Sequence, residues 1–142
     1  MQEDVHQIGE VAERTGLSLR TIRYYEEMRL VVPSGRTTGG FRLYTEHDID
    51  RLELVKRLKI LDLSLESTTD MLAARDLLAA GAGGDGGEAE GAIEILAAYA
   101  DGAEERLEKL ADRLEAAREA ARQLKAEVRR HRRGAAGIVS RR

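Results

Sequence analysis

The sequence predicts a mainly α-helical protein, with a compact N-terminal domain followed by one long helix. Aromatic residues make up only 4% of the chain, whereas charged residues make up 35%. This composition favours helices and coiled coil over a large sheet. Two patterns support the same prediction: a capped helix after a glycine turn near the N-terminus, and apolar residues at heptad spacing over residues 93–128.

The first predicted helix is short and ends at a glycine. Ile8, Val11 and Ala12 are apolar residues at helical spacing. We expect this helix to end near Thr15 and Gly16, because glycine readily adopts the left-handed conformation of a helix C-cap.

A second helix is predicted to begin after Ser18, which is a favourable N-cap residue. Leu19 and Ile22 are expected to face inward. The residues expected on an outer face are Arg20, Thr21 and Tyr24.

A hairpin is predicted over residues 33–44, because Pro33 stops helical structure and Gly39-Gly40 is typical of a tight turn. Arg36 and Arg42 flank this turn. We expect Phe41 and Tyr44 to pack the hairpin, called the wing below, against the domain.

Two supporting helices are predicted over residues 45–80, which complete a domain of residues 1–80. Thr45 and Asp48 have the spacing of an approximate capping box, and Ser64 caps the next helix. The expected apolar positions are Ile49, Leu52, Val55, Leu58 or Lys59, and Leu61, followed by Leu65, Met71, Leu72 and Leu77.

The second half of the chain divides into a linker, a helix and a tail. Residues 81–91 are glycine-rich and predict a flexible linker, residues 92–133 predict a coiled-coil helix, and residues 134–142 form a basic tail. A single helix cannot bury the apolar stripe, so we expect a second copy of the chain to cover it. The dimerisation residues predicted from the stripe are Ile93, Leu96, Leu107, Leu110, Leu114, Leu124 and Val128.

The order of helix, turn, capped basic helix and basic wing is that of a winged helix-turn-helix DNA-binding domain. The second helix would enter the major groove and the wing would contact the phosphate backbone. The formal net charge is −3, so any basic surface must be local. The candidate DNA-binding residues are Ser18, Arg20, Thr21, Arg23, Tyr24, Tyr25, Arg36, Phe41, Arg42 and Tyr44.

Four motifs together resemble the MerR family of bacterial transcription regulators. They are R-T-I-R-Y-Y-E, V-P-S-G-R, G-G-F-R-L-Y and T-E-H-D-I-D-R-L, and they cover about the first half of the chain. Phe41 stands where tyrosine is more usual in the family. The second half is similar only in kind, as a long helix.

The resemblance implies a homodimer, paired through antiparallel helices, on a near-palindromic promoter operator. It implies recognition contacts from Arg20, Thr21, Arg23 and Tyr24, and wing contacts, mainly to phosphate, from Arg36, Arg42 and Tyr44. It also implies that the dimer bends and untwists promoter DNA close to RNA polymerase.

The sequence disfavours several other classes of protein. The chain has no cysteine and three isolated histidines, so we expect no metal site and no cofactor. No catalytic constellation, membrane span or secretory signal is recognisable, and we expect a cytoplasmic protein that is not an enzyme. The short tail implies that no separate effector-binding domain follows the helix, which leaves the existence of an effector open.

Two alternatives stay open at this point: an architectural or excisionase-like DNA-binding protein without direct promoter control, and an interaction protein in which the long helix is the working part. The tail arginines are consistent with compensation of the helix dipole or with extra phosphate contacts. The residues concerned are Arg129, Arg130, Arg132, Arg133, Arg141 and Arg142.

Overall fold

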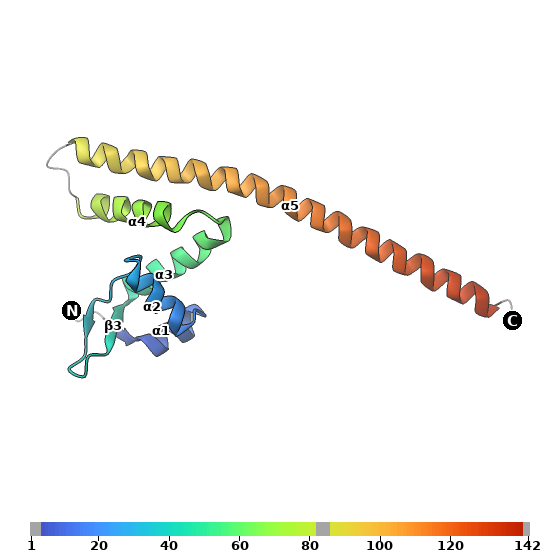
Figure 1. The fold of residues 1–142 in the computed structure, drawn as a ribbon, viewed down its shortest axis with the longest axis horizontal. Helices are drawn as coiled ribbons and strands as arrows, with labels where there is room; N and C mark the ends of the chain where they lie inside the picture. The colour runs from blue at the N-terminus through green and yellow to red at the C-terminus, as the bar shows by residue number, and fades with distance from the viewer. Residues whose placement is uncertain (1–3, 82–85, 141–142) are drawn as a thin grey trace. The chain divides into compact units, whose positions relative to one another are not determined.

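The computed structural model describes residues 4–81 and 86–140, and the chain divides into two compact units at Glu104–Glu105. The first unit contains a small sheet, four helices and the start of the long helix α5 (Figure 1). The second unit consists of the rest of α5. The predicted fold class, a mainly α winged helix-turn-helix domain followed by a long helix, is confirmed.

The helix-turn-helix forms as predicted. Helix α1 (Ile8–Thr15) ends at Gly16, whose φ of 72° is left-handed. Helix α2 (Leu19–Glu27) begins at Ser18, whose side chain accepts a hydrogen bond from the backbone N–H of Thr21 at 3.0 Å. The inward orientation predicted for Leu19 is wrong: it lies in the first turn of α2 and is 41% exposed, while Ile22 and Tyr25 form the buried face.

The wing belongs to a three-stranded antiparallel sheet of order β1-β3-β2. Strands β2 (Gly35–Arg36) and β3 (Arg42–Thr45) form the predicted hairpin, and Gly40 has the positive φ of 83° that its turn requires. Strand β1 (Val5–Gln7) was not predicted, because three residues with one apolar side chain give no periodic signal.

The supporting helices have the predicted caps. Helix α3 (Glu46–Leu58) begins with the complete Thr45–Asp48 capping box and runs into a 3₁₀ turn, η1 (Lys59–Leu61). Helix α4 (Leu65–Ala79) begins at Ser64. The buried core comprises Val11, Ile22, Tyr25, Leu30, Val31, Tyr44, Ile49, Leu52, Val55, Met71, Leu72 and Tyr99.

Helix α5 (Gly86–Ser140) is longer than the sequence predicted at both ends. It begins within the segment interpreted as a flexible linker and continues through most of the segment interpreted as a tail. Of the predicted linker, residues 82–85 lie outside the described residues. The predicted linker was therefore longer than the structure shows. Glycine lowers helix propensity by only about 1 kcal/mol per residue, and a long helix tolerates that cost.

The first turns of α5 pack against their own domain. Ala92 and Tyr99 are buried, Leu96 is packed against the core, and the Tyr99 hydroxyl lies 3.0 Å from Oγ1 of Thr68 on α4. The assignment of Leu96 to a free dimer stripe is therefore wrong. Heptad spacing identifies an apolar face, but it does not say which helix covers it.

Most of the other apolar side chains predicted for the stripe lie uncovered on α5. Ile93, Leu107, Leu114, Leu124 and Val128 are exposed, and Leu110 is half-buried. These are the remaining residues predicted for dimerisation. Within residues 4–81 and 86–140, no helix is both long and apolar enough to cross a membrane.

Candidate nucleic-acid interface

Helix α2 presents a polar and basic face on a fixed apolar base. Arg20, Arg23 and Tyr24 are exposed and Thr21 is half-buried, while Ile22 on the opposite face is fully buried. Because the core fixes the inner face, the outer side chains are held on a rigid element, as direct readout of DNA bases requires. Arg20, Thr21 and Tyr24 lie together, as the sequence predicted, and Arg23 is exposed on the same helix.

Three other predicted contact residues have structural roles. Tyr25 is only 3% exposed and Tyr44 is fully buried, so neither ring is available to DNA in this structure. Ser18 caps α2, and its hydroxyl also lies 2.8 Å from that of Thr21. The packing of Tyr44 against the domain is as predicted, whereas its role and that of Tyr25 as DNA contacts are not supported. A tyrosine at the edge of an apolar pattern fits either a core or a surface position.

Both wing arginines meet the carboxylate of Glu26, at the C-terminal end of α2. Arg42 Nε forms an ion pair with Glu26 Oε2, and Arg36 Nη2 lies 3.8 Å from Glu26 Oε1. The Glu26 side chain is only 18% exposed. Glu26 was not identified from the sequence as a partner of the wing, because a sequence does not show which residues the hairpin contacts after it folds back.

The Tyr44 hydroxyl is a third partner of Glu26, at 3.3 Å from Oε2. Burial, together with the negative charge and the hydrogen bond of Glu26, raises the pKa of Tyr44 to about 12. Tyr44 is thus a neutral hydrogen-bond donor beneath the wing, and it ties β3 to α2.

Phe41 lies at the end of the wing and is 64% exposed. The prediction that it packs the hairpin against the domain is wrong. The turn is held instead by the Thr37 N–H, which donates to Phe41 O at 2.8 Å, and by the Phe41 N–H, which donates to the Thr37 hydroxyl. The Phe41 ring lies close to Gly39, where a Cβ atom would be 3.3 Å from it.

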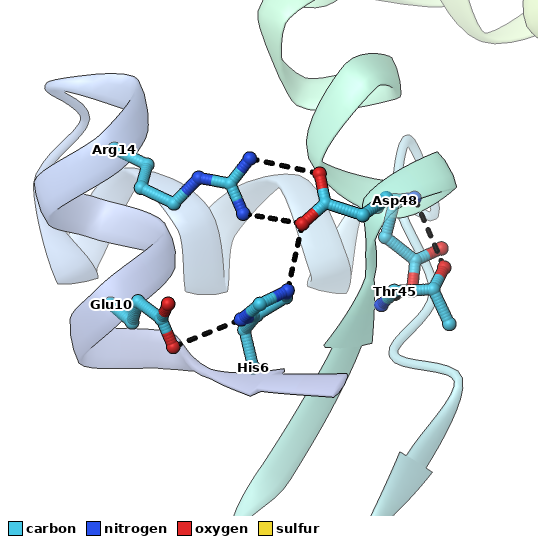
Figure 2. Close-up of polar contacts among 6 residues, drawn as sticks. His6, Glu10, Arg14, Thr45 and Asp48 are labelled. Carbon is cyan, nitrogen blue, oxygen red and sulfur yellow. Dashed lines mark hydrogen bonds and ion pairs between the residues drawn. The ribbon is translucent and has the colours of Figure 1, made fainter. Parts of the chain in front are cut away.

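A charged cluster joins the other end of the sheet to the helices (Figure 2). Glu46 on α3 accepts two hydrogen bonds from Arg14, at 2.6 and 2.8 Å, and contacts His6 Nε2 at 2.8 Å. His6 Nδ1 lies 3.0 Å from Glu10. This cluster could not be predicted from the sequence, because its members come from β1, α1 and α3.

The cluster shifts two ionisation equilibria. Hydrogen bonds from Arg14, with the charges of Arg14 and His6, lower the pKa of Glu46 to about 2 despite some desolvation. The hydrogen bond to Glu10, and then the contact with Glu46, raise the pKa of His6. Both shifts favour the charged forms that hold β1 and α1 to α3.

A cleft of about 480 Å³ lies beside the outer face of α2. Its lining includes Arg20, Thr21 and Tyr24 of α2, Lys59 of η1, and Asp62. The cleft brings a second basic side chain close to the predicted recognition residues. Within the described part of the chain, no group of three or more histidine, aspartate or glutamate residues is arranged to hold a metal ion.

Residues 7–75 match the model of the MerR HTH family regulatory proteins. The regulator ZntR of Escherichia coli (strain K12) is 42% identical over 71 residues, which cover 50% of each protein. YfmP of Bacillus subtilis (strain 168) is 50% identical over 60 residues, covering 42% of this chain and 43% of YfmP. The chain thus spans about half the length of these curated relatives.

Two solved structures share the fold. HiNmlR, a MerR family regulator lacking the sensor domain and bound to promoter DNA, matches with a TM-score of 0.63 and 22% identity, over 79% of this chain and 76% of HiNmlR. A putative MerR family transcriptional regulator from Listeria monocytogenes matches with a TM-score of 0.56 and 26% identity, over 87% and 83% of the two chains. Residues 7–75 of this chain therefore belong to the MerR family of helix-turn-helix regulatory proteins.

Proposed function

We propose that this chain is a sequence-specific transcription regulator that binds promoter DNA as a homodimer. The observation that carries the proposal is the outer face of α2, where Arg20, Arg23 and Tyr24 are exposed beside a basic wing. Arginine can donate two parallel hydrogen bonds to guanine, and tyrosine can donate to phosphate. The family of the domain and the promoter complex of HiNmlR support this reading.

In this proposal α2 enters the major groove and the wing contacts the neighbouring backbone. Each domain reads one half-site, so a near-palindromic operator follows from the two-fold symmetry of a homodimer. The uncovered stripe from Leu107 to Val128 supports dimerisation, because an exposed apolar stripe at heptad spacing is stabilised by a partner helix.

We further propose that the dimer bends and untwists the promoter so that RNA polymerase can engage it. Deforming the DNA would supply part of the specificity, since the energetic cost depends on the sequence that is bent. The protein would act without a cofactor, in the cytoplasm, and without an enzymatic activity of its own.

Selection of bound fragments from genomic DNA, followed by footprinting, tests the function. We expect a protected near-palindrome within a promoter and strong competition by that duplex over random DNA. Equal competition by random DNA would contradict sequence-specific binding. Protection of a preferred site with bending, but with no effect on transcription in vitro, would support the architectural alternative instead.

A further inference from the structure

We propose that Glu26 is a positioning residue of the wing, which holds Arg36 and Arg42 in place so that the two terminal nitrogens of Arg42 face DNA phosphates. This inference rests on the proposed DNA-binding function and assigns a role to a residue that would not itself contact DNA. A negative charge at a DNA-binding surface is unfavourable by itself, so its place here requires an explanation.

Three side chains of the hairpin converge on this one carboxylate. Arg42 and the Tyr44 hydroxyl contact Oε2, and Arg36 lies 3.8 Å from Oε1. Glu26 lies on α2, the helix that carries the predicted base contacts, so these interactions join the wing directly to the recognition helix. These contacts therefore link the position of the wing to the position of α2.

The pairing of the strands explains why an acid is needed here. Arg36 and Arg42 are directly opposite each other across β2 and β3. Side chains opposite each other in an antiparallel pair share a face, and two like charges there destabilise the pairing. The Glu26 carboxylate contacts both arginines and offsets this repulsion.

The same contacts leave donors available for DNA. Arg42 uses Nε toward Glu26, and none of the hydrogen bonds or ion pairs found among the described residues uses its two terminal nitrogens. Those two nitrogens form the fork that binds phosphate through parallel hydrogen bonds. Arg36 is fixed from its other side, since its Nη1 donates to Gly40 O at 3.0 Å.

Glu27 provides a matched control for the charge. It is adjacent on α2 and exposed, and no hydrogen bond or ion pair of its side chain is found in the described part of the chain. Charge alone predicts that Glu26→Gln and Glu27→Gln both strengthen DNA binding slightly, because each removes one repulsive carboxylate. Positioning predicts opposite signs for the two substitutions.

The test measures binding of the full chain to its selected operator duplex over a range of salt concentrations. We expect Glu27→Gln to bind as tightly as the wild type or slightly more tightly. We expect Glu26→Gln to bind roughly 3- to 10-fold more weakly, the cost of ordering one released side chain, with a salt slope reduced by about 1 as one phosphate contact is lost.

A double-mutant cycle separates positioning from a general loss of structure. Once Arg42→Ala has removed the positioned group, adding Glu26→Gln should weaken binding much less than it does in the wild type. Equal weakening in both backgrounds, or equal affinities of Glu26→Gln and Glu27→Gln, would overturn the inference. If the wild type shows no operator preference at all, the proposed function is what fails.

A second variant covers the case in which Glu26→Gln does not fold. Glu26→Asp keeps the charge but withdraws it by one methylene group from the arginines. We expect a folded Glu26→Asp protein, checked by circular dichroism and thermal unfolding, to bind the operator more weakly than the wild type. A folded Glu26→Asp protein with wild-type affinity and salt slope would overturn the positioning role.

Discussion

At the scale of single residues, the Glu46 carboxylate makes the stability of the domain depend on pH. The pKa of Glu46 falls from 4.5 to about 2 in the folded chain, chiefly through the hydrogen bonds of Arg14. Its contribution is therefore fully present above pH 4.5 and is lost as the pH falls from 4.5 toward 2. The raised pKa of His6 acts in the opposite direction, because its contribution is present below pH 6.5 and is lost as the pH rises through the raised value.

Glu46→Gln should reduce the free energy of unfolding at pH 7 and make its decline between pH 4.5 and pH 2 shallower. The substitution removes the charged acceptor shared by Arg14 and His6. Urea unfolding followed by circular dichroism at several pH values measures both effects. Glu13→Gln, at an exposed position on α1, is the control. An equally steep acid decline in Glu46→Gln and the wild type would show that other carboxylates dominate.

Tyr44→Phe should destabilise the fold by about 1 kcal/mol at neutral pH, the usual net value of one hydrogen bond. Tyr44 also favours folding less at high pH. Its pKa of about 12 exceeds the ordinary value of 10, so its contribution is present below pH 10 and is lost as the pH rises from 10 to 12. Unfolding measurements over that range should show a smaller loss in Tyr44→Phe. Tyr24→Phe, at an exposed position, should behave as the wild type.

At the scale of elements, most boundaries followed from local chemistry. Gly16, Ser18 and the Thr45–Asp48 pair end or begin helices through contacts within a few residues, so their patterns could be read from the sequence. Strand β1 could not be predicted from the sequence, because it is stabilised by pairing with β3 and its own residues show no strand pattern.

Some residues of the candidate site could likewise be predicted from local patterns, and others could not. Arg20, Arg23 and Tyr24 were correctly placed at the surface because the periodicity of α2 fixes its outer face. Glu26 was missed as a partner of the wing, because the Tyr44 hydroxyl that it binds lies 18 residues farther along the chain. Contacts between elements carry no periodic signal, and the burial of Tyr25 and Tyr44 depends on such contacts.

Substitutions in α2 and in the wing should weaken DNA binding in different ways. We expect Arg42→Ala to lower affinity about equally for all sequences. Arg20→Ala should also relax base preference, by roughly 1–3 kcal/mol for a bidentate contact. Competition binding with operator variants measures the difference, and Lys109→Ala, at an exposed position on α5, controls for loss of one positive charge. Uniform loss in Arg20→Ala would identify Arg20 as a phosphate contact only.

At the scale of the whole molecule, helix α5 belongs to both compact units. The first turns of α5 bury Ala92 and Tyr99 against their own domain, whereas the stripe from Leu107 onward has no cover within the described chain. The heptad pattern runs through both regions without interruption, which is why the sequence assigned both to a dimer. Only the part that remains exposed is available to the partner helix of the proposed dimer.

Leu114→Asp should convert the proposed dimer to a monomer and abolish binding to the proposed near-palindromic operator. A carboxylate in the middle of the stripe would have to be desolvated at the helix interface, which is strongly unfavourable. Size-exclusion chromatography with light scattering measures the oligomeric state. Ala116→Asp adds the same group off the stripe and should leave the dimer intact. A Leu114→Asp protein that is still dimeric would contradict the assigned interface.

The exposed ring of Phe41 also makes the wing accessible to spectroscopy. The chain contains no tryptophan, so Phe41→Trp would introduce a single indole fluorophore at the end of the wing, where the native ring is already 64% exposed. We expect its emission to shift to shorter wavelength when the wing meets DNA, because water is displaced from the ring. Rapid mixing with the operator would then measure the rate at which the wing docks on DNA, separately from the rate of any later bending of the DNA.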